Sequence, residues 1–165
     1  LNSSPLKEVS GNDNYNNKHF MSYNKPASLH FNLDLPPKEI RGNHRSHFRT
    51  YRKFYNQYQE QGLVAIHNAL LAGKTKIPLK KTLIVYTFMS NRLIDLDNFA
   101  YGMKAIQDSL VYKNVLIDDD ALTIQPINRF QKCTIKERKV DVMLFDTSNY
   151  KKVSIFVDSD FLLEL

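Results

Sequence analysis

The sequence contains very little cysteine and no long apolar run. Cys133 is the only cysteine among 165 residues, which excludes an internal disulfide and a zinc site built on cysteines and favours a reducing cytoplasm. Because no stretch of about 18 apolar residues and no basic-then-apolar leader is visible, we expect neither a membrane span nor secretion. Acidic residues are also in deficit, 17 against 23 lysines and arginines, and this balance favours polyanionic partners.

A chain of this length forms one domain by default, and its 42% hydrophobic and 12% aromatic residues are typical of a folded protein. Residues 1–27 are rich in Asn, Ser and Lys and have no apolar period, so we predict a flexible N-terminal tail there. Residues 28–165 are predicted to form the folded domain.

Apolar periodicity predicts the main elements of that domain. Alternation predicts a half-buried strand at 28–35, and a helical period predicts a helix from Ser46 to Ala72. The continuously apolar residues 81–89 predict a central strand buried on both faces. A second helix is expected from Asp97 to Val111, with Phe99 among its buried residues. Strand-like segments follow at 121–127, 139–146 and 151–158. The last two are expected to pair through a turn, and the whole order predicts an α+β fold with a mixed β-sheet and two main helices.

Five of the acidic residues fall in two short groups. Asp95 and Asp97 are two residues apart, so on an extended segment both side chains would project from one face and could hold one hard cation. Mg²⁺ usually takes one or two protein carboxylates and fills its other positions with water and substrate phosphate. Asp118, Asp119 and Asp120 follow the second helix and would supply a further ligand if that helix packs back suitably. Gathering five like charges would require a compensating cation, because crowding raises the pKa of carboxylates.

Ordinary structural roles also account for the same residues. Asp97 is a good N-cap for the second helix, and three consecutive aspartates are typical of a solvated acidic turn. Lys104 could compensate the carboxylates, or it could be an exposed helix lysine paired with Asp108 four residues further on.

The segment DLDNFAYGMKAIQDSL, followed by LIDDDAL, resembles the signature of the RusA-type Holliday junction resolvases. In that signature an Asp-x-Asp-Asn segment opens a helix that carries a lysine, and an Asp-Asp turn follows. The upstream LDLPPKEIRGNHR resembles the family's Pro-Pro segment, so that the resemblance covers about residues 28 to 146. It implies a RusA-like fold and a homodimeric endonuclease, dependent on Mg²⁺ with Mn²⁺ as a substitute, that nicks four-way DNA junctions symmetrically.

When the positions of the signature are matched to this chain, the family's catalytic roles fall on particular residues. Asp95 and Asp97 would be the first pair of metal-binding catalytic carboxylates. The later one would be Asp120 if the Asp-Asp-Ala sequence is matched, which is the preferred match, or Asp119 if the spacing from Asp108 is kept.

The catalytic lysine departs from the family's spacing. The family places it four residues after the second aspartate, where this chain has Tyr101. Lys104 stands three residues further on, nearly one helical turn and about 4.5 Å along the axis. Its four-carbon stem could cover that distance and let it stabilise the transition state or the leaving oxygen.

The densest positive run of the chain begins just after the first strand. Its members are Lys38, Arg41, Arg45, Arg49, Arg52 and Lys53. Spacings of four residues would place several of them on one ridge of a helix, where they would bind the DNA backbone without reading its sequence. The alternative is a solvated helix face. Tyr51, Tyr55 and Tyr58 on the same helix are expected to face the core, with base stacking as the alternative.

Two other functions remain open. A nuclease for flaps or other branched DNA, or another magnesium phosphotransferase, would keep the metal site and change the substrate. A non-catalytic DNA-binding protein would keep only the scaffold, and the displaced lysine is the feature that keeps that alternative open.

Overall fold

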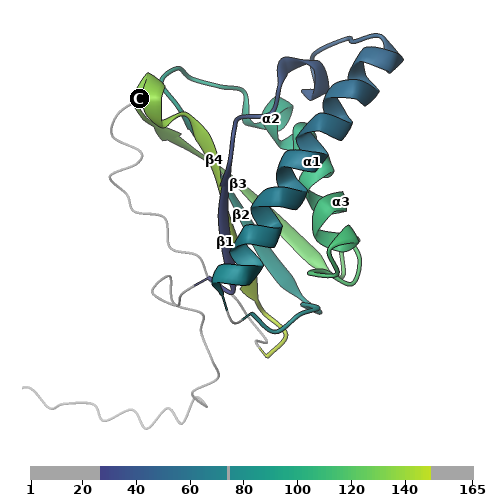
Figure 1. The fold of residues 1–165 in the computed structure, drawn as a ribbon. Coiled ribbons are helices and arrows are strands. Elements are labelled where there is room, and N and C mark those ends of the chain that lie inside the picture. Colours follow the sequence, from purple (N-terminus) through teal and green to yellow (C-terminus); the bar gives the residue numbers. More distant parts are fainter. Residues whose placement is uncertain (1–26, 74, 150–165) are drawn as a thin grey trace, which may run out of the picture.

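The computed structural model describes residues 27–73 and 75–149. Most of the predicted tail and the strand expected at 151–158 lie outside the described residues. Within them the strands are β1 (Leu29–Leu33), β2 (Thr82–Ser90), β3 (Ile124–Lys132) and β4 (Lys139–Asp146), and the α-helices are α1 (Phe48–Ala72), α2 (Leu96–Gly102) and α3 (Lys104–Tyr112) (Figure 1). Two short 3-10 helices are η1 (Lys38–Ile40) and η2 (Ile135–Glu137).

The four described strands form one mixed sheet in the order β1-β4-β2-β3. β2 and β3 are parallel, and β4 is antiparallel to both β1 and β2. The predicted α+β class with a mixed sheet is therefore confirmed. β4 pairs with β1 on one side and β2 on the other, and the pairing expected between β4 and residues 151–158 lies outside the described residues.

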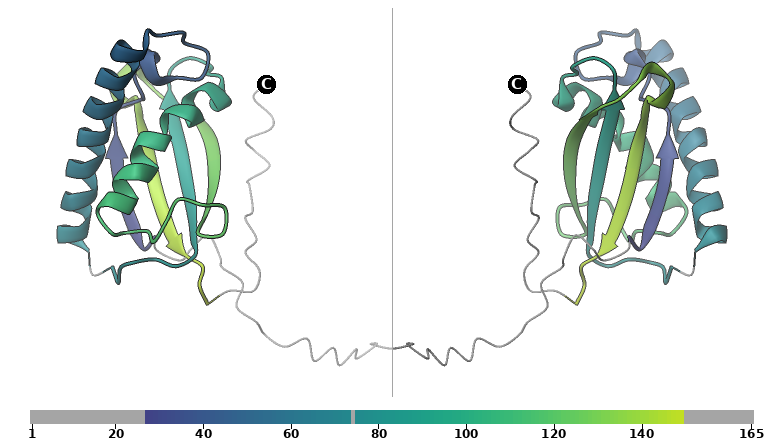
Figure 2. Two further views of the ribbon diagram at one scale, coloured as in Figure 1. Left: turned by 90° about the vertical axis from the view of Figure 1, so that its right-hand side faces the viewer. Right: turned by 90° about the vertical axis from the view of Figure 1, so that its left-hand side faces the viewer.

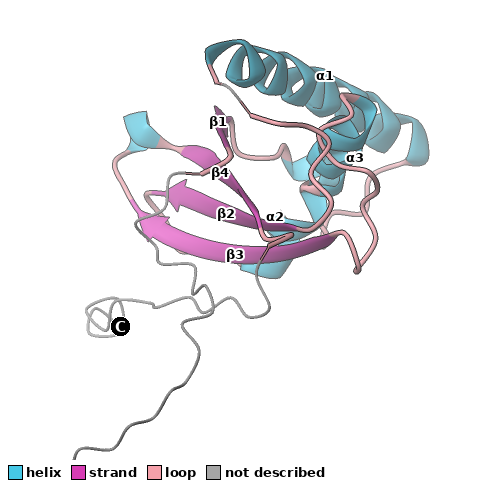
Figure 3. Ribbon diagram, turned by 90° about the horizontal axis from the view of Figure 1, so that it is seen from below, coloured by secondary structure: helices cyan, strands magenta, loops and turns pink. Residues whose placement is uncertain are grey.

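Helices α1 and α3 lie on one face of the sheet and enclose the main core (Figures 1 and 3). The two views of Figure 2 show this helical face and the opposite face of the sheet. β1 alternates buried and exposed residues as predicted, and Phe31 and Leu33 pack in the core. On β2, Ile84, Tyr86 and Phe88 face the helices. Leu83 and Val85 join Phe145 in a second, smaller cluster, which confirms that β2 is buried on both faces.

The long helix α1 packs against α3 through a glycine. A Cβ atom at Gly62 would lie 2.8 Å from Cδ1 of Ile106, so the absent side chain permits the close approach of the two helices. Tyr58 and Ile66 are fully buried, and Tyr51 and Tyr55 pack at the edge of the same core, as expected of the tyrosines.

The prediction of one continuous helix from Asp97 to Val111 is wrong. The chain forms two helices there, α2 and α3, with a break at Met103. The N–H of Met103 donates to Ala100 O at 2.9 Å, an i−3 bond that tightens the last turn of α2. Gly102 lies against Pro36, whose Cβ would be 2.7 Å from an added Cβ. The expected burial of Phe99 is nevertheless confirmed.

Among the helices of the described ranges, none has both the length and the hydropathy that crossing a bilayer requires.

Candidate active site

Asp95 and Asp97 lie where the chain leaves the central strand. β2 ends at Ser90, and a short loop leads to α2 (Figure 1). Asp95 is the N-cap of α2, and its Oδ1 accepts the backbone N–H groups of Asp97 at 3.2 Å and Asn98 at 3.5 Å. The side-chain amide of Asn98 donates to Asp95 Oδ2 at 2.5 Å. The orientation of the Asp95 carboxylate is therefore set by α2 itself.

Asp97 occupies the first turn of α2 instead of an extended segment. The expected arrangement, with both carboxylates projecting from one face of an extended chain, is therefore wrong, and so is the alternative in which Asp97 is the N-cap. The Asp97 carboxylate is exposed and has no hydrogen bond or ion pair with other described residues. A negative charge at this position is favoured by the helix dipole, and its oxygens are available to a ligand.

The second acidic group lies in the loop between α3 and β3. Asp118 Oδ1 accepts the N–H of Asp119 at 2.7 Å. Asp120 Oδ1 accepts the N–H groups of Leu122 at 2.8 Å and Thr123 at 2.7 Å, which turns the chain into β3. The hydrogen bonds from the backbone and side chain of Thr123 hold the pKa of Asp120 below its usual value.

Lys104 joins this loop to α3. Its ammonium forms an ion pair with Asp119 and lies 2.8 Å from Asp108 Oδ1, the i+4 partner that the sequence suggested. The hydroxyl of Tyr55 on α1 donates to Asp108 Oδ2. Burial, followed by this hydrogen bond and the Asp108 charge, raises the pKa of Tyr55. One hydrogen-bonded network thus links α1, α3 and the loop before β3.

The segments that carry the two acidic groups adjoin opposite ends of the parallel pair β2 and β3. Ser90 pairs with Lys132 at one end and Thr82 pairs with Ile124 at the other. In residues 27–73 and 75–149, no group of three or more His, Cys, Asp or Glu side chains is arranged to hold a metal ion. Asp95 and Asp97 thus stand together at the start of α2, whereas Asp119 is paired with Lys104 at the start of α3.

A pocket of about 470 Å³ adjoins Asp95 at the end of β2. It lies where β2 and β4 meet, since Met89 pairs with Lys139. Three arginines and one carboxylate provide the charged side chains of its wall. The lining includes Arg41, Arg92, Leu93, Asp95, Ile135 and Arg138.

Arg41 is fixed in this pocket. Its Nε donates to Pro36 O at 2.8 Å, and its guanidinium lies 4.0 Å from the centroid of the Phe99 ring. Burial lowers the pKa of Arg41, and the positive charge of Arg138 lowers it further. Two guanidinium groups therefore face the same space, 97 positions apart in the sequence.

The other residues of the predicted DNA-binding run lie outward. Lys38 is in η1, Arg45 precedes α1, and the remaining three are on the first turns of α1. Lys38, Arg45, Arg49, Arg52 and Lys53 are all exposed. Only Arg49 and Lys53 lie on one helical ridge at the predicted spacing of four residues.

Arg92 and Arg138 were missed by the sequence reasoning. Arg92 had a signal, because it stands three residues before Asp95 in the segment that leaves β2. Arg138 had none, because it reaches the pocket only through the antiparallel pairing of β4 with β2.

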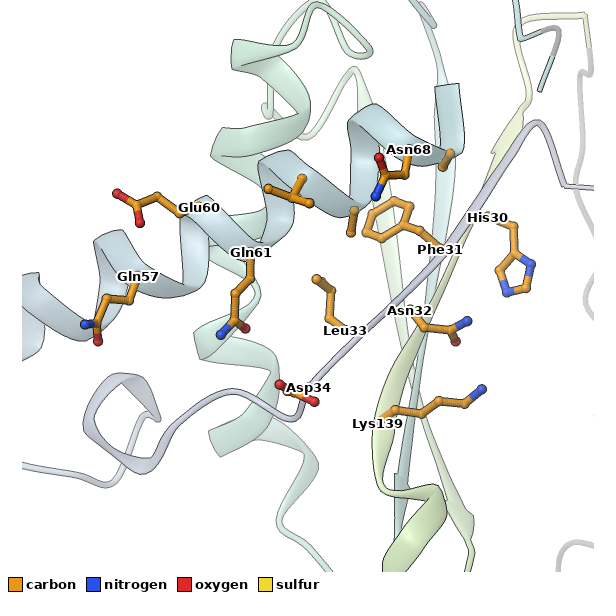
Figure 4. A pocket seen from close by; sticks show the side chains of 13 residues that line it. His30, Phe31, Asn32, Leu33, Asp34, Gln57, Glu60, Gln61, Asn68 and Lys139 are labelled. Carbon is orange, nitrogen blue, oxygen red and sulfur yellow. The ribbon is translucent and has the colours of Figure 1, made fainter. Parts of the chain in front are cut away.

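A second groove, of about 1180 Å³, lies between β1 and α1 (Figure 4). Phe31 and Leu33 point toward α1, whereas His30 and Asn32 lie on the other side of β1. None of the candidate catalytic, metal-binding or DNA-binding residues lines this groove.

A comparison of the sequence with protein-family models and with curated proteins finds no match.

Proposed function

We propose that this protein is a magnesium-dependent, structure-specific endonuclease of the RusA type that resolves four-way DNA junctions in the cytoplasm by paired symmetric nicks. The observation that carries the proposal is the exposed carboxylate pair Asp95 and Asp97, placed at the end of the central strand beside a pocket with three arginines. Carboxylates and guanidinium groups are the side chains that a hydrolase for phosphodiesters requires, the first for a metal ion and the second for phosphate.

The donor chemistry of the pair fits Mg²⁺. The Asp95 carboxylate is held in place by α2, and Asp97 adds a second carboxylate with no partner among the described residues. Two carboxylates are sufficient, since water and substrate phosphate usually fill the remaining positions around Mg²⁺. A bound Mg²⁺, or Mn²⁺ in its place, would supply an activated water and neutralise charge on the phosphate.

The later aspartates have a different assignment in this proposal. Asp119 is neutralised by Lys104, and Asp120 uses its carboxylate to hold the turn into β3. We assign the metal contacts to Asp95 and Asp97, because Asp97 is unpaired among the described residues and Asp95 stands beside it at the start of α2. The hydrogen bonds that Asp95 and Asp120 accept leave acceptor sites on both carboxylates, so Asp120 stays a catalytic candidate together with Asp119 and Lys104, whose ion pair would first have to open.

The basic residues support DNA as the substrate. Arg49, Arg52 and Lys53 expose positive charge along the start of α1, and Arg41 adds one in the pocket. Contacts of this kind position DNA through its phosphates. Symmetric nicking of a four-way junction further requires two active sites related by a two-fold axis, which is why the proposal includes a homodimer.

The proposal is tested by cleavage of an end-labelled synthetic four-way junction, with Mg²⁺ and with chelator. We expect paired nicks that need Mg²⁺ and that Asp97→Asn slows by at least about 100-fold, the loss of a charged metal ligand. Asp34→Asn is the matched control, because it neutralises an exposed aspartate at the end of β1.

Each alternative has its own result. Cleavage of flaps but not of four-way junctions would show that the protein is a nuclease for flaps or other branched DNA and not a junction resolvase. Tight junction binding with no metal-dependent nick would favour a non-catalytic DNA-binding protein, for which the displaced Lys104 is the specific observation. A monomer by sedimentation at micromolar concentration would count against paired nicking.

A further inference from the structure

Three arginines from distant parts of the chain converge on the pocket beside Asp95. Arg41 follows η1, Arg92 follows β2, and Arg138 precedes β4. The Arg41 guanidinium is held by Pro36 O and by the Phe99 ring, so one positive group is fixed in the pocket wall before any ligand arrives. Preorganised donors of this kind lose little entropy when an anion binds.

The positive charge of the pocket exceeds its negative charge, because three arginines and one carboxylate line it, although Glu39 also acts on Arg41. Arg92 and Arg138 are exposed, and within the described part of the chain neither side chain makes a hydrogen bond or an ion pair. Asp95 is the carboxylate that lines this pocket, and its oxygens already accept hydrogen bonds from α2. Burial and, after it, the positive charge of Arg138 lower the pKa of Arg41, and an anion between the two guanidinium groups would offset both effects.

We propose that Arg41, Arg92 and Arg138 form a binding site for one backbone phosphate of a DNA strand, next to the phosphate that is cut at Asp95 and Asp97. The choice of DNA as the source of the phosphate rests on the proposed function, whereas the anion site itself rests on the pocket. Guanidinium groups suit this ligand because they bind two phosphate oxygens at once.

Apolar side chains flank the same arginines. Leu93 and Ile135 line the pocket although they are 81% and 71% exposed. They offer an apolar surface to the sugar and base that adjoin a bound phosphate, which inorganic phosphate lacks. This rim favours a nucleotide unit of a strand over a free anion.

Arg92→Gln and Arg138→Gln are the decisive variants, because both residues are exposed and unpaired among the described residues, so their loss should not affect folding. Binding of a labelled junction is measured by fluorescence anisotropy in chelator, over a series of salt concentrations. We expect each variant to bind about tenfold more weakly and to lower the slope of log affinity against log salt by about 0.9, the loss of one phosphate contact.

Lys136→Gln is the matched control. It removes the same charge two positions from Arg138, on η2, at a residue that does not line the pocket. We expect its affinity and salt slope to stay within twofold of the unmodified protein. Equal effects of Lys136→Gln and Arg138→Gln, or no effect of either arginine variant, would overturn the proposal.

A second arm distinguishes the source of the phosphate. Inorganic phosphate is compared with chloride at equal ionic strength for its effect on Tm. If phosphate stabilises the unmodified protein but not Arg138→Gln, while DNA binding is the same in both, the ligand is a free anion and the DNA assignment is wrong. If the arginine variants lose DNA binding but no cleavage occurs with Mg²⁺, the phosphate site stands and the nuclease proposal fails.

Discussion

Lys104, the first residue of α3, forms an ion pair with Asp119 in the loop before β3. The same ammonium lies 2.8 Å from Asp108 Oδ1. Two residues that the RusA-type resemblance assigns to catalysis are therefore bound to each other. This contact gives both of them a structural role that can be measured separately from any activity.

The first prediction concerns that pair. The Lys104 and Asp119 side chains are 53% and 24% exposed, so solvent screens their attraction. A double-mutant cycle with Lys104→Met and Asp119→Asn should give a coupling free energy of unfolding of about 0.5 kcal/mol, measured by urea denaturation. The coupling should diminish in 1 M salt, where exposed charges are screened. Strictly additive effects at low salt would mean that the pair contributes nothing to the stability of the fold.

The second prediction concerns the pH dependence of stability at Asp120. Hydrogen bonds from Thr123 hold the folded-state pKa of Asp120 below its ordinary 3.8. A carboxylate with a lowered folded pKa stabilises the protein above its unfolded pKa, and this contribution is lost as the pH falls through the folded value. Asp120→Asn should therefore have a lower Tm than the unmodified protein at pH 7, and the gap should close progressively on acidification. A gap that stays constant down to pH 2 would show that the charge of Asp120 is irrelevant to the turn.

The third prediction concerns the tyrosines. Burial raises the pKa values of Tyr55, Tyr58 and Tyr86 above the ordinary 10.0, with the Asp108 hydrogen bond adding to the effect at Tyr55. Because their folded pKa values are raised, the stability they contribute is present below pH 10 and is lost as the pH rises further.

Absorbance at 295 nm should therefore show that Tyr55, Tyr58 and Tyr86 stay protonated in the native protein near pH 10 and ionise on alkaline unfolding, with Tyr51, whose pKa burial also raises, delayed as well. Tyr58→Phe should remove one of these delayed groups. It should also cost about 1 kcal/mol of stability, because Tyr58 donates to Asp34 O at 2.8 Å. Ionisation of all nine tyrosines in one step near pH 10, without unfolding, would contradict the burial of these rings.

The fourth prediction concerns the glycine at the end of α2. A Cβ at position 102 would lie 2.7 Å from Pro36 Cβ, in a rigid ring that cannot rotate away. Gly102→Ala should therefore destabilise the protein by about 1–3 kcal/mol, measured by urea denaturation. Gly62→Ala is the comparison and should cost less, since its Cβ would meet the flexible end of Ile106 at 2.8 Å and Ser109 Oγ at 3.1 Å, and the helix preference of alanine offsets part of that clash. Equal stability of Gly102→Ala and the unmodified protein would mean that α2 can move away from Pro36.

Much of the secondary structure was predictable because it depends on short-range periodicity. Apolar patterns predicted the buried faces of three elements, and the structure confirms these elements. The patterns are the alternation of β1, the helical period of α1 and the apolar run of β2. The prediction that residues near Asp97 begin a helix also depends on local chemistry, and α2 begins one residue earlier, at Leu96. Phe48, the first residue of α1, fits the apolar period of that helix but is 68% exposed.

The sequence by itself determined which faces of the elements are apolar, where charge is concentrated, and that Asp95 and Asp97 stand at a strand-to-helix junction. Only the tertiary structure decided which elements and side chains lie next to one another. Periodicity identifies a buried face without identifying what covers it, so the place of β4 between β1 and β2 could not be read from the chain. For the same reason the break at Met103, the pairing of Lys104 with Asp119, and the meeting of Arg41 with Arg138 follow from long-range packing.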